Sequence, residues 1–171
     1  SAASSFGDEA YSTAMLLSDL QQLGRIGSQW KILGTDISDR VLRSAIEAVY
    51  PEDRLRNVTP ERLRRHCLRG DGASEGLIQI SPKLRKHVSF GQLNLCQPIE
   101  DIGPFDVIFL RNVLIYFDGQ SKQRVLDHVR SALRPGGYLV AGAAEGVSEL
   151  LRDFARVAPW LFRKPEAEPR R

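Results

Sequence analysis

The sequence has little cysteine and no long apolar run. Only two cysteines, Cys67 and Cys96, occur in 171 residues, which is too few for a disulfide framework and typical of a reducing compartment such as the cytoplasm. No run of 18 apolar residues occurs, so the sequence predicts no membrane-spanning segment. The histidines, His66, His87 and His128, are not spaced as metal ligands relative to the cysteines, so we expect no metal site.

Positive charge is small overall but concentrated in one stretch. A formal net charge of +3 is too low to indicate nucleic-acid binding by itself. Six arginines nevertheless lie close together: Arg54, Arg56, Arg62, Arg64, Arg65 and Arg69. Such a stretch is typical of a solvated helix face, and a docking surface for an acidic partner is the alternative. No aromatic residue lies among these arginines for base stacking, so we expect no nucleic-acid partner.

The order of the expected elements indicates the fold class. Segments with helical apolar spacing alternate with short apolar runs, which is the signature of a doubly wound α/β sheet. We therefore predict an α/β fold with a mostly parallel sheet, ending in an antiparallel hairpin formed by 155–157 and 160–163. The other expected strands cover 30–35, 77–80, 88–92, 105–110 and 138–141, and the expected helices cover 7–23, 38–49, 59–70 and 121–133.

The two ends of the chain differ from a complete doubly wound domain. Only Ser1-Ala2-Ala3 precede the first turn, where such a domain normally has a full strand. The sequence therefore predicts a truncated first strand, and we expect a fragment or another segment that completes this position. We expect one domain over 1–163, followed by a tail or linker at 164–171 that lacks large apolar residues.

Polar residues follow two of the expected strands. Arg111 and Asn112 come directly after the apolar strand 105–110, with the hydroxyl of Tyr116 just beyond. Asn94 and Leu95 follow the strand 88–92, where an exposed asparagine beside a backbone amide could read an adenine edge. Because ligands bind outside the carboxyl ends of strands in open α/β sheets, these residues indicate a site. The alternatives are polar strand ends, a packing tyrosine and a turn asparagine.

A glycine turn and an acidic residue form a second pattern. Gly7 allows close approach of the backbone to a ligand, and the helix after it offers free N–H groups. Asp36 stands at the end of the next strand, where one carboxylate can accept both ribose hydroxyls of an adenosine. The alternative is an ordinary turn followed by an aspartate that caps a helix.

Together these motifs resemble the CheR-type chemotaxis receptor methyltransferases, from Ser1 to about Arg163. Residues 1–12, SAASSFGDEAYS, are similar to the family's cofactor motif SAGCSTGEEPYS. The segment 34–37 looks like its strand-end acid motif, and 93–95 matches as well. The most specific match is 104–117, PFDVIFLRNVLIYF.

The resemblance implies a Rossmann-like class I methyltransferase sheet with S-adenosylmethionine as cofactor and S-adenosylhomocysteine as product. It implies that Glu9 and Asp36 contact the cofactor beside Gly7, with Asp36 at the ribose. Asn94 and Leu95 would lie at the adenine.

The resemblance also implies the substrate, which is the glutamate side chains of chemotaxis receptor helices in the cytoplasm. Asn112 would then lie near the methionine part of the cofactor, and Tyr116 near the transferred methyl group. Tyr116 and Arg111 would hold the incoming carboxylate. Nothing in the sequence suggests an obligate dimer, so we expect a monomer.

The segment 68–80 resembles the family's small β-subdomain, which we expect to cover about 68–92. In some members this element binds a peptide from the receptor's C-terminus by adding a strand to its edge. The long glycine loop at 70–76 resembles those members. An ordinary hairpin is the alternative.

The chain also departs from the family's pattern. Ala3 replaces a glycine, and Phe6 replaces a threonine where small residues let the cofactor approach. The segment 143–146 lacks a histidine and a serine that the family has there. The family's N-terminal helical domain is absent from this sequence. These departures favour one alternative, a degenerate, non-catalytic regulatory or receptor-binding module. A methyltransferase of the same fold acting on another protein carboxylate is a further alternative.

Overall fold

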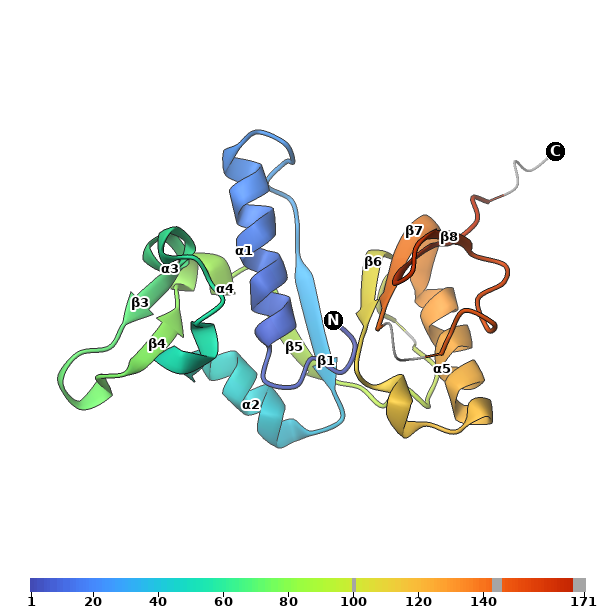
Figure 1. Ribbon diagram of the computed structural model, residues 1–171, viewed down its shortest axis with the longest axis horizontal. Coiled ribbons are helices and arrows are strands. Elements are labelled where there is room, and N and C mark those ends of the chain that lie inside the picture. Colours follow the sequence, from blue (N-terminus) through green and yellow to red (C-terminus); the bar gives the residue numbers. More distant parts are fainter. Residues whose placement is uncertain (100, 143–145, 168–171) are drawn as a thin grey trace. The chain divides into compact units, whose positions relative to one another are not determined.

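A computed structural model describes residues 1–99, 101–142 and 146–167. The chain forms two compact units, each with its own helices and strands (Figure 1). The first unit comprises Ser1 and Ala3–Gln92, and the second comprises Ala2 and the residues from Leu93 onward. No helix in the described ranges is long and apolar enough to cross a membrane.

The first unit contains two small sheets. Strand β1 pairs in parallel with β5, and strands β2, β4 and β3 form an antiparallel sheet in that order. Its elements are α1 (Asp8–Gln22), β1 (Ile32–Asp36), α2 (Asp39–Glu47), β2 (Val49–Pro51), a 3-10 helix (Glu52–Leu55), α3 (Pro60–His66), β3 (Cys67–Arg69), a second 3-10 helix (Gly72–Ser74), β4 (Leu77–Ile80), α4 (Pro82–Arg85) and β5 (Val88–Gln92).

The predicted helix at 59–70 is wrong in its second half. Helix α3 begins as expected, with Thr59 accepting a hydrogen bond from the Arg62 N–H and Pro60 in the first turn. It ends at His66, because the next residues gain ladder hydrogen bonds to β4 in place of helical ones. The antiparallel sheet β2-β4-β3, called the small sheet below, also includes residues 49–51, which the expected subdomain did not. Strand β5 was expected within the subdomain but pairs with β1 instead.

The ring of Phe90 organises the centre of the first unit. Phe90 on β5 lies opposite Gly34 on β1. A Cβ atom added to Gly34 would lie 2.5 Å from the ring, and one added to Gly7 would lie 3.0 Å from it. The ring of Tyr11 packs on it as well, at 5.6 Å between centroids. The two glycines thus let one aromatic ring hold the first turn, helix α1 and strand β1 together.

The second unit is built on a four-stranded sheet in the order β6-β7-β9-β8. Strands β6 and β7 are parallel, and β7, β9 and β8 are antiparallel. Its elements are β6 (Phe105–Leu110), a 3-10 helix (Leu114–Tyr116), α5 (Gly119–Ala132), β7 (Leu133–Ala141), β8 (Ala155–Ala158) and β9 (Leu161–Arg163). The predicted α/β class and the C-terminal antiparallel hairpin are confirmed.

Helix α5 shows why the sequence forms these elements. Asp118 caps the helix by accepting a hydrogen bond from the Ser121 N–H at 2.7 Å. Its apolar residues recur on one face, which is buried: Val125, Leu126, Val129 and Ala132. The sequence spacing predicts this buried face correctly, and the helix begins two residues earlier than expected, at Gly119.

Both ends of the chain make strand-like contacts. In the first unit the Thr35 N–H donates to the Ser1 carbonyl at 2.9 Å, and in the second the Ala2 N–H donates to the Phe109 carbonyl at 2.8 Å. In place of a full first strand, Ser1 and Ala2 make these strand-like hydrogen bonds. In the expected tail, the Lys164 ammonium donates to the carbonyls of Arg130 and Leu133 at 2.6 and 2.7 Å. The tail is anchored at its start, and 168–171 lie outside the described residues.

The basic stretch is largely neutralised by acidic residues of the same unit. Asp19 on α1 accepts hydrogen bonds from Arg62, Arg65 and His66 at 2.8, 2.8 and 3.0 Å. Burial by itself would raise the pKa of Asp19, but the bonds from His66, Arg62 and Arg65 outweigh it and hold that pKa below its usual range. The stretch therefore fastens α3 to α1, which is a structural use that neither sequence interpretation included.

Replacement of Gly34 should destabilise the chain through Phe90. We expect Gly34→Ala to lower the free energy of unfolding by about 1–3 kcal/mol, because the methyl group would overlap the ring. Gly91→Ala is the matched control, since a Cβ there meets nothing within 4 Å. Urea unfolding measures both variants. Equal stability of the two variants would contradict this packing argument.

Acid should erase the contribution of Asp19. A carboxyl with a lowered folded pKa stabilises the chain above its unfolded pKa of about 3.9, and this stabilisation is lost as pH falls through the folded value. We expect Asp19→Asn to be less stable than the unmodified chain at pH 5 by about 1–3 kcal/mol. At pH 3 the gap should narrow. A gap of the same size at both pH values in urea unfolding would refute the assignment.

Candidate cofactor site

The first turn of the chain has an unusual backbone. Every second residue has a positive φ: Ala3 at 59°, Ser5 at 50° and Gly7 at 87°. This conformation suits glycine but costs a residue with a Cβ atom about 1 kcal/mol or more. Hydrogen bonds close the turn, since the Ser4 N–H donates to the Thr35 carbonyl at 2.7 Å and the Gly7 N–H donates to the Ser4 carbonyl at 2.9 Å. The surroundings therefore hold a strained turn in place.

Asp36 fixes this turn from the end of β1. Its Oδ2 accepts the Ser5 N–H at 2.9 Å, and its Oδ1 accepts the Ser38 N–H at 3.0 Å. Each carboxylate oxygen can accept two hydrogen bonds, so each still has one acceptor position. Asp36 therefore closes a turn before α2, whose N-cap is Ser38, and does not cap the helix as the alternative interpretation had it. Its carboxylate keeps a capacity to accept two further hydroxyl donors.

The structure brings the three predicted residues of the first unit together around this turn. Gly7 is the N-cap of α1 and, as glycine, supplies no side-chain cap to the helix. Glu9 lies in the first turn of α1 and accepts a hydrogen bond from the Ser1 hydroxyl at 2.8 Å. The space beside Gly7 is filled by Phe90 and Ala45, so glycine is needed there for packing as well as for conformation.

Phe6 does not fill the turn in the way the sequence suggested. Its ring packs against the buried cluster that contains Tyr11 and Tyr50. The guanidinium carbon of Arg54 lies 4.9 Å from the ring centroid. The Phe6 carbonyl accepts a hydrogen bond from the Tyr50 hydroxyl at 2.6 Å. The ring is thus partly buried against the core, beside the antiparallel sheet β2-β4-β3.

In the second unit, Asn94 and Leu95 form a tight turn after β5. The Asn94 Oδ1 accepts the Cys96 N–H at 3.0 Å, and its carbonyl accepts the Gln97 N–H at 2.9 Å. This is the turn role that the sequence left open. Leu95 is buried, and its carbonyl contacts the Nδ1 of His128 at 3.1 Å. Among the described residues the Leu95 N–H has no partner, so it remains a donor for a ligand.

Arg111, Asn112 and Tyr116 follow β6, as the sequence predicts. All three are exposed, and Tyr116 is 81% accessible. Asn112 has a φ of 58°, a conformation that asparagine tolerates better than most residues. The buried Leu114 anchors the 3-10 helix that carries Tyr116. The residues are therefore presented at the carboxyl end of β6 rather than buried in the core.

Sequence reasoning missed several residues that support these groups. Gly34 and Phe90 shape the first turn, Tyr50 and Arg54 hold Phe6, and His128 contacts the Leu95 carbonyl. Gly34 could have been found, because a glycine inside an expected strand marks a close approach of another group. Tyr50, Arg54 and His128 act through contacts distant in sequence, for which no local pattern exists. No group of three or more potential metal ligands gathers anywhere in the described ranges.

Residues 1–159 match the family described as CheR methyltransferase, SAM binding domain. The chain belongs to this family. It is 43% identical over 155 residues to a chemotaxis protein methyltransferase of Escherichia coli strain K12, which covers 90% of the chain and 54% of that protein. It is 39% identical over 156 residues to one of Salmonella typhimurium, covering 91% and 54%.

A third relative is chemotaxis protein methyltransferase 2 of Pseudomonas aeruginosa. The identity is 40% over 160 residues, covering 91% of this chain and 56% of that protein. The chain thus spans about half the length of these curated relatives. The resemblance found in the sequence is confirmed at the level of the family.

Two substitutions of Asn112 should separate its backbone role from its side-chain role. We expect Asn112→Gly to keep the stability of the chain, because glycine readily adopts a positive φ. Asn112→Ala should lower the free energy of unfolding by about 1 kcal/mol. If the side chain contacts the cofactor, both variants should bind S-adenosylhomocysteine more weakly. Thermal unfolding and calorimetric titration measure the two effects, and unchanged affinity in both variants would exclude the side-chain role.

Proposed function

We propose that this chain is the cofactor-binding catalytic part of a methyltransferase that modifies glutamate side chains of chemotaxis receptors, with S-adenosylmethionine as methyl donor. The observation that carries the proposal is the geometry of Asp36, in a chain of the CheR family. Two backbone N–H groups fix its carboxylate beside the strained turn, and two acceptor positions remain for ribose hydroxyls.

Each unit, taken by itself, carries residues that fit a part of such a cofactor. Asp36 would accept the ribose hydroxyls, and Gly7 and Glu9 would lie beside it at the start of α1. The unpaired Leu95 N–H would donate to the adenine edge, with Asn94 holding the turn. Asn112 would lie near the methionine part. The donors and acceptors present match a nucleoside linked to a charged amino acid.

The proposed chemistry needs no strong base. S-adenosylmethionine supplies an electrophilic methyl group on a sulfonium. A glutamate oxygen bonds to the methyl carbon as the carbon–sulfur bond breaks, and the bonding pair stays on sulfur, so a methyl ester and a neutral thioether result. Because a glutamate carboxylate is already ionised at neutral pH, no proton moves. The residues of this chain then act by alignment, with Tyr116 and Arg111 holding the incoming carboxylate.

The exposure of Tyr116 suits a macromolecular substrate. A tyrosine that is 81% accessible can be reached by a glutamate on the surface of a receptor helix. We propose that the chain acts on the cytoplasmic helices of receptors, as a monomer in the cytoplasm. The two substitutions that favoured a non-catalytic module are both accommodated, since Phe6 packs against the core and the turn closes around Ala3. This supports the enzyme over that alternative.

The small sheet has features that suit a receptor tail peptide. Strand β3 lies at the edge of the order β2-β4-β3. The His66 carbonyl and the Gly70 N–H bond toward β4, so by alternation the backbone groups of Cys67 and Arg69 face away from it. The Cys67 N–H already donates to the Leu63 carbonyl of α3, so an added strand could pair with the Cys67 carbonyl and with the backbone groups of Arg69.

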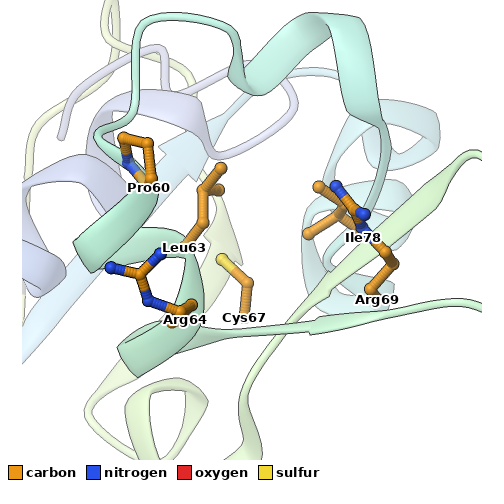
Figure 2. A pocket seen from close by; sticks show the side chains of 6 residues that line it. All are labelled: Pro60, Leu63, Arg64, Cys67, Arg69 and Ile78. Carbon is orange, nitrogen blue, oxygen red and sulfur yellow. The ribbon is translucent and has the colours of Figure 1, made fainter.

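A cavity of about 380 Å³ lies beside the same edge strand (Figure 2). Pro60, Leu63 and Arg64 of α3 line one side, and Figure 2 shows Arg69 and Ile78 on the other. Burial raises the pKa of the Cys67 thiol to about 11, so the thiol stays neutral and offers apolar surface. The cavity suits an apolar side chain of a peptide, and Arg64 suits its terminal carboxylate.

Loss of charge at Arg64 should weaken peptide binding. We expect Arg64→Glu to bind synthetic peptides of receptor C-terminal tails at least about tenfold more weakly than the unmodified chain, equal to about 1.4 kcal/mol. Arg56→Glu is the control, since it makes the same charge change in the same stretch but does not line the cavity. Fluorescence anisotropy measures the affinity. Equal weakening in both variants, or no binding at millimolar chain, would reject this docking site.

Methyl transfer tests the proposal as a whole. We expect labelled methyl groups to pass from S-adenosylmethionine to glutamates of purified receptor fragments. Asp36→Asn should raise the KM for S-adenosylmethionine at least about tenfold, because an amide NH₂ cannot accept the backbone N–H that the carboxylate oxygen accepts. Tyr116→Phe should lower kcat with little change in that KM. Mass spectrometry locates the esters.

The control for Asp36 is Asp39→Asn, an exposed carboxylate three residues along that pairs with Arg43. It should leave both constants unchanged. Cofactor binding without any methyl incorporation would favour the regulatory module. Incorporation only into other proteins would favour a different carboxylate substrate.

A further inference from the structure

The two residues that flank Gly7 are held by strand β2 and the 3-10 helix that follows it. Arg54, on the 3-10 helix after β2, donates from Nε and Nη2 to the two carboxylate oxygens of Asp8 at 2.7 and 2.8 Å. The same guanidinium lies over the ring of Phe6, at 4.9 Å from its centroid. Tyr50 on β2 donates its hydroxyl to the Phe6 carbonyl at 2.6 Å. One arginine and one tyrosine thus contact the residues on both sides of the glycine.

These contacts are directional as well as attractive. A two-pronged arginine–carboxylate pair fixes the orientation of both groups, and a cation over an aromatic ring fixes the ring beneath it. Burial raises the pKa of Tyr50, so its phenol stays protonated and donates. Arg54 also lies 5.7 Å from the ring of Tyr50. The small sheet therefore sets the path of the backbone from Phe6 to Asp8.

The turn needs such support because its own conformation is strained. Ala3 and Ser5 have positive φ values, each of which an L-residue adopts at a cost. A strained loop persists only when its surroundings over-determine it. The ion pair itself is partly exposed, with 40% and 47% of the Arg54 and Asp8 side chains accessible, so it adds little to overall stability. Its effect should therefore be local to the turn.

We propose that Arg54 is a positioning residue for the cofactor turn, acting through Phe6 and Asp8 to keep residues 3–8 in the conformation that binds S-adenosylmethionine. The inference rests on the proposed function, since it concerns the same site. The small sheet and the 3-10 helix after β2 would then support cofactor affinity in addition to docking a peptide. It also accounts for Phe6, whose ring supplies the surface on which Arg54 lies.

Calorimetric titration of the full chain with S-adenosylhomocysteine tests the inference. Arg54→Met keeps most of the stem but removes the charge, and we expect about fivefold to tenfold weaker binding because a smaller fraction of molecules has the turn formed. Arg56→Met is the matched control, two residues along on the same segment, and should bind as the unmodified chain does. The midpoint of thermal unfolding should stay the same in both. Unchanged affinity in Arg54→Met would overturn the proposal.

A double substitution tests the route through Phe6. With Phe6→Thr in place, Arg54→Met should weaken binding less than it does alone, because the ring on which Arg54 lies is gone. Fully additive effects would contradict the route. Should Arg54→Met lower the unfolding midpoint, Asp8→Asn, which removes the same ion pair from the other side, replaces it with the same expected loss.

Amide hydrogen exchange of the ligand-free chain separates this inference from the proposed function. We expect the Ser4 and Ser5 amides, which donate to Thr35 and Asp36, to exchange about tenfold faster in Arg54→Met, with no change in α2. Unchanged exchange would refute the positioning role whatever the ligand result. Faster exchange in a chain that does not bind S-adenosylhomocysteine would refute the proposed function and leave the positioning of the turn supported.

Discussion

The packing of the Phe90 ring against two residues without side chains is the constraint on which the first unit depends. Gly34 and Gly7 come from different elements, and a Cβ atom at either position would meet the ring at 3.0 Å or less. Because the ring can sit there, the first turn lies directly against β1. The Ser4 N–H then reaches the Thr35 carbonyl, and the Ser5 N–H reaches the Asp36 carboxylate. The acceptor groups of the candidate site follow from this close approach.

The turn lies close to β1 in a strained backbone conformation, and contacts from outside the turn stabilise that conformation. Ala3 occupies a left-handed conformation in a position where the family motif has glycine. Asp36 holds the turn on one side, and Arg54 with Tyr50 holds it on the other. A substitution that looks damaging in the sequence is therefore compensated by partners that the motif does not contain. The conformation of this turn therefore depends on contacts from other elements of the first unit, and not on the sequence of the turn alone.

Much of the fold was predictable because its signals are local. Apolar periodicity located α1, α5 and most strands, and the polar residues after β1 and β6 stand where the sequence placed them. The errors have a common physical origin. Strand β3 continues directly from α3 and was read as helix, since only its pairing with β4 makes it a strand. The arginines of the basic stretch looked like a free surface, since nothing local shows that Asp19 and Asp8 pair with them.

The positions of the candidate site residues along the fold were predictable, but the contacts of their side chains were not. Asn94 could be named as a site residue and as a turn residue, and the structure shows the turn. Phe6 could be named as an obstacle to the cofactor, yet its ring packs against the buried core. The direction of a side chain depends on neighbours such as Tyr50 and Arg54, which the sequence does not place.

Backbone amide shifts in a titration of the labelled chain with S-adenosylhomocysteine test the central claim most directly. The claim is that the first turn, in the conformation that Asp36 fixes, binds the cofactor, and that the candidate residues of the second unit respond to the same ligand. It predicts saturable shifts at micromolar ligand for residues 4–10 in the first unit, and for Leu95 and residues 111–116 in the second. No shifts at millimolar ligand, or shifts confined to other parts of the chain, would contradict it.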